Sequence, residues 1–460
     1  MKKRVLVVSS ILGIASFNFI NLQALLNYGA QAKPNYINKD NTPFNNPITD
    51  KGATLGRVLF YDKFLSANNS LACAGCHMQQ FAFGDTATVS KGHLGGFTTR
   101  HAMRLVNARF GIEQKFFWNE RASSLEDQTT HPLKDAVEMG WSGTMGQGNM
   151  DSLIKKMRGI SYYKVLFPFV FGDSSITETR IQFALAQFIR SMQSFDSKFD
   201  QGLAQTPNLV ANFPNYTAQE NQGKALFMLA PNAGGAGCQG CHAAPEFDID
   251  PNTKNNGVIA VAGSNTSVDL MNTRAPSLRN VFNQNGQLNG PLMHNGNFKS
   301  LLAVVNHYNN VPQAPVNTNL DPRLQGPGSQ LNLTQAQKDA LIAFIKTLSG
   351  SAIYTDERWS DPFDAPGVLS MISGISELGA KSKLSLTVFP SIAQSEITVG
   401  VSDQANYYVM IRSINGALMC EKEFSSTEKV DVSSYANGLY FVEVINKSNQ
   451  SAALAKFIKN

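Results

Sequence analysis

The sequence predicts a mainly helical protein with two related domains in tandem, followed by a small all-β sandwich domain. Three observations predict this architecture. An internal repeat places matching segments in the two halves of the first 350 residues. Segments 176–200 and 333–350 carry apolar residues at helical spacing. From about residue 383 onward, apolar and polar residues alternate with the period of a β-strand.

Length and composition limit the class of protein. At roughly 150 residues per domain, the 460 residues predict about three domains. Apolar residues make up 43% and aromatic residues 10%, which excludes a disordered chain and a small disulfide-linked scaffold. The net charge is +5 without a basic stripe, so we expect no nucleic-acid partner. We place the boundaries at a leader (1–32), two helical domains (45–205 and 206–352), a linker (353–383) and a β-domain (384–460).

The chain begins like a secretory signal peptide. Lys2-Lys3-Arg4 precede an apolar run that ends at Phe17 and is too short for a permanent span. Cleavage after Ala24 or after Ala32 fits the small residues there. No other segment reaches the ~18 apolar residues that a span requires. We therefore expect an exported protein with no permanent membrane span, located in the periplasm, at the outer-membrane surface or in the medium.

The last ~75 residues predict a β-sandwich. Residues 384–399 and 440–444 alternate apolar and polar side chains, and Asn415-Gly416 and Asn437-Gly438 predict hairpin turns between such runs. The segments LSLTVFPS, IRSINGAL and VDVSSYANGLYFVEV resemble the C-terminal sorting domain of type IX-secreted bacterial proteins. This resemblance implies the type IX secretion machinery as a partner. The alternative is a carbohydrate- or protein-binding appendage.

Four of the five cysteines lie in two motifs of identical spacing, Cys73–His77 and Cys238–His242. Both read C-x-x-C-H, the attachment signature of c-type haem. Thiols at positions i and i+3 each form a thioether to a haem vinyl group, and the next residue, His, reaches the iron. A zinc site or a thioredoxin-type pair would not require His after both second cysteines. The sequence therefore predicts two covalent c-type haems, proximal ligands His77 and His242, and two cytochrome c-type haem domains.

The internal repeat supports two equivalent haem domains. Matching landmarks are Gly56–Phe60 with Gly223–Phe227, Thr99-Arg100 with Thr273-Arg274, and Trp118-Asn119 before Ser124 with His294-Asn295 before Ser300. Thr334 is the predicted N-cap of the last helix of the second domain.

Over roughly residues 50–350, the sequence resembles the bacterial dihaem cytochrome c peroxidases and their MauG-type relatives. The marks of this resemblance are LGRVLFYDKFLS, FWNERASSLEDQ, PLKDAVEMG, APSLRNV and LMHNGNF. The resemblance implies a cytochrome-c peroxidase that reduces hydrogen peroxide to water at the N-terminal haem. It also implies a small cytochrome or another external donor as the source of electrons. Whether the chain forms a homodimer is left open.

The resemblance assigns roles around the first haem. Glu138 matches the family's distal acid, and Gln128 matches a second distal polar group that holds peroxide or water. Trp118 matches a tryptophan between the two haems that relays electrons, although it could equally be a core residue. His93, in a glycine-rich loop, matches a histidine that caps the N-terminal haem in the resting peroxidases. The alternative is an exposed loop histidine, as in MauG-type members.

Around the second haem, Tyr308 stands where the peroxidases have Met and MauG-type proteins have Tyr as the sixth ligand. Met293 and His307 are competing ligands, and water on the iron beside a packed tyrosine is a further alternative. Arg100, Arg121 and Arg279 are expected to pair with haem propionates or with carboxylates at the domain junction.

The family also carries a calcium ion between its domains, bound by an Asn side chain and main-chain carbonyls. The matching position here is His101, a poor ligand for a hard, oxygen-seeking cation. Carbonyls near Asn289 and Pro291 are the remaining ligands that the resemblance suggests, so calcium binding is left open.

Two rival functions remain. A MauG-type enzyme would use peroxide to oxidise a protein or organic substrate; Tyr308 favours this hypothesis and His93 opposes it. A non-catalytic dihaem electron carrier would have both irons permanently six-coordinate, and peroxide would change neither.

Overall fold

The computed structural model describes residues 25–112, 114–249, 251–264, 266–365, 368–369, 385–402, 404–413, 418–448 and 452–460. Residues 26–371 form one compact unit, and the strands after residue 385 belong to another. The predicted leader up to residue 24 and the predicted turn at Asn415-Gly416 lie outside the described residues.

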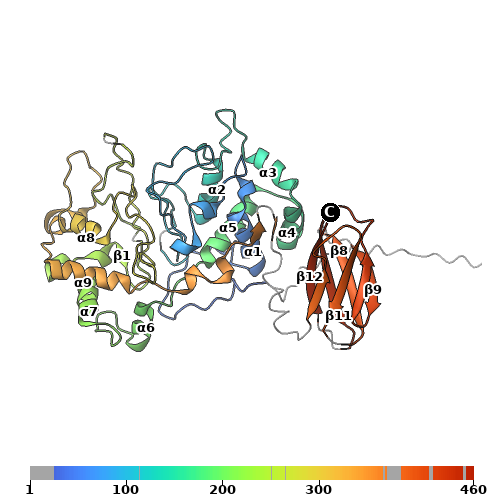
Figure 1. Ribbon diagram of the computed structural model, residues 1–460. Coiled ribbons are helices and arrows are strands. Elements are labelled where there is room, and N and C mark those ends of the chain that lie inside the picture. Colours follow the sequence, from blue (N-terminus) through green and yellow to red (C-terminus); the bar gives the residue numbers. More distant parts are fainter. Residues whose placement is uncertain are drawn as a thin grey trace, which may run out of the picture. The chain divides into compact units, whose positions relative to one another are not determined.

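The first unit is built mainly from helices (Figure 1). They are α1 (Asp50–Tyr61), α2 (Leu125–Lys134), α3 (Met150–Arg158), α4 (Ser161–Phe171), α5 (Glu178–Ser191), α6 (Lys198–Gln205), α7 (Ala218–Met228), α8 (Leu301–Asn309) and α9 (Gln335–Lys346). Short antiparallel pairs join β1 (His242–Ala243) to β2 (Asp248–Ile249) and β3 (Phe363–Ala365) to β4 (Val368–Leu369). In the described part of the chain, no helix combines the length and the apolar character that a membrane crossing requires.

Helices α1 and α5 pack closely because α1 carries a glycine where they meet. A Cβ at Gly56 would overlap the backbone of Ala184 in α5 and crowd the side chain of Phe188. Phe60, one turn after Gly56, packs edge-on against Phe188 with ring centroids 5.3 Å apart. The Gly56–Phe60 segment is therefore a helix-packing motif.

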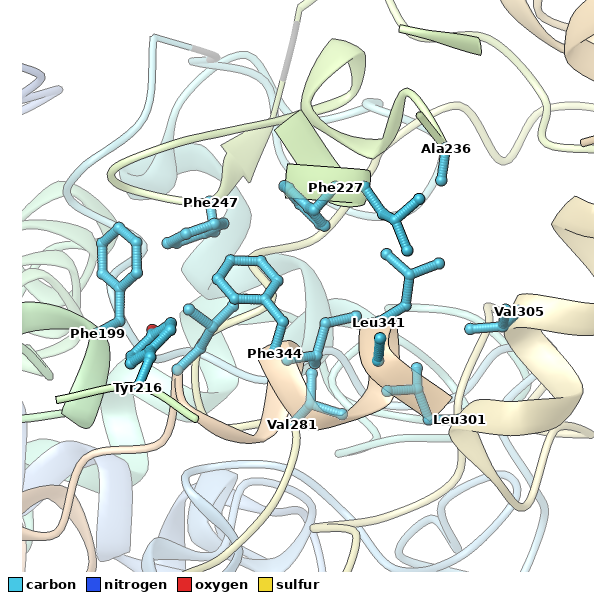
Figure 2. Close-up of a cluster of buried hydrophobic side chains, with 14 of the residues drawn as sticks. Phe199, Tyr216, Phe227, Ala236, Phe247, Val281, Leu301, Val305, Leu341 and Phe344 are labelled. Atoms are coloured by element: carbon cyan, nitrogen blue, oxygen red, sulfur yellow. The ribbon is translucent and has the colours of Figure 1, made fainter. Parts of the chain in front are cut away.

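The same packing occurs between α7 and α9, as the internal repeat predicts. A Cβ at Gly223 would overlap the backbone of Ala340 in α9 and crowd Phe344. Phe227, one turn after Gly223, lies 5.2 Å from Phe344 between ring centroids. Figure 2 shows these two rings with Phe247 in the core of the second half.

The repeat extends to the turns between the helices. Phe117 and Met293 occupy matching turns, and both have left-handed backbone angles, with φ of +73° and +66°. Each turn leads to a serine, Ser124 before α2 and Ser300 before α8, that caps the helix by accepting a backbone N–H. Thr334 caps α9 as predicted.

The predicted helix over 176–200 is two helices. Helix α5 ends at Ser191, and α6 begins at Lys198. Between them, the Asn107 side chain accepts from the Ser194 N–H at 2.8 Å and donates to the Ser194 carbonyl at 3.1 Å. Such side-chain bonds compete with helical backbone bonds, and apolar periodicity does not reveal them.

The C-terminal unit is a sandwich of two sheets. Its strands are β5 (Leu386–Phe389), β6 (Ile392–Ala393), β7 (Glu396–Val401), β8 (Tyr407–Ser413), β9 (Leu418–Phe424), β10 (Thr427–Asp431), β11 (Gly438–Asn446) and β12 (Ala452–Lys459). One sheet has the order β10-β7-β5 and the other β6-β12-β11-β8-β9. Ile397 and Val399 of one sheet and Val442 and Val444 of the other are fully buried, which confirms the predicted alternation.

The turn predicted at Asn437-Gly438 is not a hairpin turn. The strands before and after it, β10 and β11, belong to different sheets, so this segment crosses the sandwich. Gly438 begins β11 with φ of +155°. The prediction was wrong because a crossing and a hairpin favour the same turn residues.

Candidate functional site

The first C-x-x-C-H motif forms a single 3-10 turn, Cys73–Gly75. The His77 N–H donates to the Cys73 carbonyl at 3.0 Å, so the imidazole directly follows the two thiols. His77 Nδ1 lies 3.1 Å from the Phe83 carbonyl oxygen. A ring that donates its Nδ1–H there keeps Nε2 available for a metal. Cys73 and Cys76 are not joined in a disulfide and can therefore bond covalently to another group.

The second motif repeats this geometry in the turn Cys238–Gly240, where the Cys241 N–H donates to the Cys238 carbonyl at 3.2 Å. Burial lowers the pKa of His242 to about 4 and the pKa of His77 below its usual value. Both imidazoles are therefore neutral near pH 7, the form that binds metals.

A cavity of about 550 Å³ adjoins the second motif, and we call it the second site. This volume lies in the range of cofactor pockets. Cys238, Cys241 and His242 line it, and Met293 and Tyr308 lie among the remaining wall residues. The second site therefore has the size and the reactive groups to hold a haem.

The first site is a smaller cavity of about 60 Å³ beside the first motif. Its walls include the three reactive residues of the motif and the predicted distal residues, namely Cys73, Cys76, His77, Gln128 and Glu138, together with Pro132 of α2. The structure thus brings the predicted proximal and distal residues together. Cofactor pockets measure several hundred cubic ångströms, so these walls must move apart to admit a haem.

Glu138 follows α2 in a loop that is held by the Asp135 carboxylate, which accepts from the Glu138 N–H at 2.9 Å. The pKa of Glu138 is raised to about 7, mainly by burial and also by the Asp135 charge, while the Arg121 charge partly offsets the shift. A carboxyl group with this pKa exchanges protons readily near neutral pH. Glu138 therefore has the acid–base properties that its predicted role requires.

His93 does not line the first site. It is buried, and its Nδ1 lies 3.2 Å from the Val137 carbonyl oxygen. The His93 ring also packs against Gly140, where an added Cβ would overlap it. The role of His93 as a cap of the first haem stays a prediction.

Trp118 lies in the wall of the second site although it belongs to the first half of the chain. Its indole N–H donates to the His101 carbonyl at 2.8 Å, and its ring meets the ring of His294 edge-on at 6.3 Å. The backbone N–H groups of Thr273 and Arg274 donate to the Trp118 carbonyl. The predicted inter-haem tryptophan thus sits where the two halves meet.

Of the three candidate ligands on the far side of the second site, two line the cavity. These are Tyr308 and Met293. His307 does not line it, and its Nε2 lies 2.8 Å from the Asn256 carbonyl oxygen. Burial raises the pKa of Tyr308 well above its usual value, so its hydroxyl is neutral in the polypeptide without a metal.

The comparisons with known proteins agree with this geometry. Residues 50–208 match the family model of di-haem cytochrome c peroxidase, and residues 387–460 match the model of the secretion system C-terminal sorting domain. Over the first of these segments the chain therefore resembles the di-haem cytochrome c peroxidase and MauG family, whose members are named both peroxidases and MauG. Its C-terminal β-sandwich is a sorting domain, which is typical of exported proteins.

Family members resemble the chain over most of their length. The methylamine utilization protein MauG of Methylophilus methylotrophus is 29% identical over 317 residues, which cover 68% of this chain and 86% of that protein. The cytochrome c551 peroxidase of Nitrosomonas europaea is 26% identical over 65% of this chain and 80% of its own. The crystal structure of a MauG-like protein associated with microbial copper homeostasis superposes with a TM-score of 0.58 and 29% identity, over 72% of this chain and 98% of the other.

Two of the three arginines that were expected to pair with haem propionates or carboxylates pair with carboxylates, and the third lies against an aromatic ring. Arg279 forms a buried ion pair with Asp200 at 2.8 Å, and Arg100 pairs with Asp269. The Arg121 guanidinium lies over the Phe117 ring, 3.5 Å from its centroid.

Three residues of the second site were missed by the sequence analysis. Arg104 lines the cavity from the first half, and its buried Nε has no hydrogen-bond partner among the described residues. The same holds for Nε2 of His294. Asn256 lines the cavity and contacts the candidate ligands. In the sequence, His294 was recognised only as a landmark of the repeat, and no sequence signal pointed to Arg104 or Asn256.

The family's calcium ion fits this chain poorly. His101 is buried, and its Nδ1 lies 3.0 Å from the Ala87 carbonyl oxygen, so this ring presents nitrogen where a calcium ligand would present oxygen. Asn280 and Asn289 each bury an amide oxygen that has no hydrogen-bond partner among the described residues. Calcium takes six to eight oxygen ligands, so main-chain carbonyls and water would have to complete such a site, and calcium binding stays open. We assign no role to calcium.

Proposed function

We propose that the chain is a dihaem c-type peroxidase that reduces hydrogen peroxide to water at the first site. The observation that carries this proposal is Glu138, a half-buried carboxyl group that lies in the same cavity as Cys73, Cys76 and His77 and has a pKa raised to about 7. The thiols of each motif would hold one haem through thioether bonds, with His77 and His242 as the proximal ligands.

The repeat supports the first site as the reactive one. Counting eight residues from the capping serines pairs Pro132, after Ser124, with Tyr308, after Ser300. Each of the two lines its own site. Proline has no side-chain atom that can bind a metal, whereas a tyrosine oxygen can. The position that offers a ligand in the second site therefore offers none in the first, which leaves room for peroxide.

The protein's own residues would manage the protons. Reduction of H₂O₂ to two waters consumes two electrons and two protons. A haem held by Cys73, Cys76 and His77 would supply the redox chemistry that breaks the O–O bond. Glu138, in its carboxylate form, would accept a proton from one oxygen of the bound peroxide. It would then return this proton to the other peroxide oxygen, which leaves as water. Gln128, in the same cavity, donates or accepts a hydrogen bond that holds peroxide in place.

The second site would take up electrons from a small cytochrome or a similar donor. Trp118, which lies in the wall of the second site at the meeting of the two halves, is the residue that we propose as the relay to the first site.

A MauG-type oxidation of a protein or organic substrate is the second candidate. Two observations favour it: Tyr308 rather than His307 lines the second site, and His93 lies outside the first. The two functions differ in the destination of the oxidising equivalents, which is a donor cytochrome in one case and a separate substrate in the other.

The test is peroxide-dependent oxidation of a reduced small cytochrome, after mass spectrometry has counted two covalent haems per chain. Turnover that collapses in Glu138→Gln supports the peroxidase. Absence of turnover with a long-lived spectral change after peroxide addition would favour the MauG-type enzyme. Absence of any spectral change would leave a dihaem electron carrier and refute both proposals.

We also propose that the exported chain begins at Leu25. The side chain of Tyr28 is 1% exposed, and its hydroxyl donates to the Arg358 carbonyl at 2.6 Å. The backbone N–H groups of Tyr28 and Gly29 donate to Asp50 in the first turn of α1. Cleavage after Ala32 would remove these contacts, whereas cleavage after Ala24 keeps them. N-terminal sequencing of the exported protein decides, and a chain that begins at Lys33 would refute this proposal.

A further inference from the structure

Asn256 is a half-buried residue in the wall of the second site. Its Nδ2 lies 3.2 Å from the Tyr308 hydroxyl oxygen and 3.4 Å from the Met293 sulfur. Its backbone carbonyl oxygen lies 2.8 Å from Nε2 of His307. One residue therefore contacts all three side chains that compete for the far side of the second haem.

The orientation of the Asn256 amide is fixed by the backbone. Its Oδ1 accepts from the Val258 N–H at 3.1 Å, so the NH₂ group must face Tyr308 and Met293. The two acceptors are unequal. A tyrosine oxygen is a strong acceptor, and more so when it carries the negative charge of a metal ligand, whereas thioether sulfur is a weak one.

The loop that carries Asn256 is held on both sides. The buried side chain of Asn255 accepts from the Gly257 N–H and from the Asn317 side chain, both at 2.8 Å. The Asn255 carbonyl accepts from the Asp321 N–H at 2.9 Å. Gly257 has φ of +86°, and a Cβ there would lie 2.8 Å from Val311. Asn256 thus projects from a rigid support, as residues that orient metal ligands do.

We propose that Asn256 is a positioning residue that selects Tyr308 over Met293 and His307 as the sixth ligand of the second haem. The inference rests on the proposed function, since it requires a haem at Cys238–His242. The Asn256 carbonyl keeps His307 outside the cavity, and the NH₂ group stabilises an oxygen ligand more than a sulfur ligand. Oxygen ligation favours ferric iron and lowers the reduction potential of this haem.

The test replaces Asn256 by leucine, which has a similar size and no N–H to donate. In the purified dihaem protein, Asn256→Leu should exchange Tyr308 for Met293. The absorption band of a methionine-ligated ferric haem should appear, and the potential of the second haem should rise. Adding Met293→Leu should abolish that band. Asn256→Asp, which also lacks a donor and repels an anionic oxygen, should show the same exchange if the leucine variant does not fold.

Asn306→Leu is the matched control. Asn306 lies exposed on α8, where its Oδ1 accepts from Lys338 at 2.9 Å, and it does not line the second site. This control should keep the wild-type spectrum and potential. A wild-type spectrum and potential in both Asn256 variants, with two haems still bound, would overturn the inference and leave the proposed function intact. Fewer than two covalent haems in the wild-type chain would instead overturn the proposed function.

Discussion

The two halves of the helical unit share their framework and differ at the far side of each haem site. Both have a glycine between two packed helices, a turn with left-handed φ and a serine-capped helix that lines the site. At the eighth residue after that serine, the first half has Pro132 and the second has Tyr308. The first half adds Glu138, and the second adds Asn256. In the proposed function, these few side chains leave the ligand position of the first site free and fill that of the second; in this sense we call the first site open and the second closed.

We expect the largest effect from a substitution that removes the proton acceptor of the first half. Glu138→Gln keeps the size of the side chain and loses its basicity, so the rate constant for the reaction with peroxide should fall by roughly 10²–10⁴-fold. Stopped-flow absorption at the haem bands measures it. Asp151→Asn, an exposed acid on α3, is the control and should react like wild type. An unchanged rate in Glu138→Gln would remove the difference that we draw between the sites.

The next prediction tests what the halves share. Gly56→Ala and Gly223→Ala each force a Cβ into the backbone of the packed helix. Overpacking of this kind costs about 1–3 kcal/mol, partly offset by the helix propensity of alanine. Both variants should lower the free energy of unfolding in urea by similar amounts. Ala225→Ser, at an exposed position of α7, should change it little. A loss in one half alone would show that the two packings are not equivalent.

The pH dependence of the peroxide reaction should follow Glu138. Its pKa of about 7 means that the carboxyl group holds its proton below that pH and cannot accept another. The rate constant should therefore be constant above about pH 8 and fall up to tenfold per unit below about pH 6. A pH–rate profile measures this, and the fall should disappear in Glu138→Gln. A rate constant that rises on acidification would contradict the role of Glu138 as base.

We expect the smallest effect from a change that makes the second site resemble the first. Tyr308→Phe combined with Met293→Leu removes both candidate ligands that line the second site, so the second haem should bind an external ligand. Titration of the ferric protein with cyanide should then give two bound ligands per chain instead of one. Phe298→Tyr, which adds a hydroxyl outside the second site, serves as control and should leave one. One bound ligand in the double variant would show that neither Tyr308 nor Met293 blocks the ligand position of the second haem.

Local signals in the sequence predicted much of the fold. The Gly56–Phe60 and Gly223–Phe227 repeat, the Thr334 cap and the alternation in the sandwich depend on nearby residues and could be read directly. The break between α5 and α6 could not, because it depends on Asn107, more than eighty residues away from Ser194. The hairpin prediction at Asn437-Gly438 failed for the related reason that the destination of the next strand is not a local property.

The candidate site divides in the same way. The attachment motifs were predicted by spacing, and Glu138 and Gln128 by family resemblance. The structure places Glu138 and Gln128 around one cavity with the first motif, while the second motif lines the other cavity. The equivalence of Pro132 and Tyr308 was present in the repeat spacing and could have been drawn from it. Arg104 and Asn256 carried no such signal, because only the tertiary fold brings them to the second site.

In the proposed protein, the first haem has a free ligand position and the second does not. The most direct test adds hydrogen peroxide to the ferric wild-type protein and counts the haems that respond, by electron paramagnetic resonance of samples frozen within the first turnover. We predict that an open, high-spin ferric signal of one haem per chain is lost at once, while the initial low-spin signal belongs to the haem at Cys238–His242. Two low-spin haems that ignore peroxide, or two high-spin haems that both react at once, would contradict it.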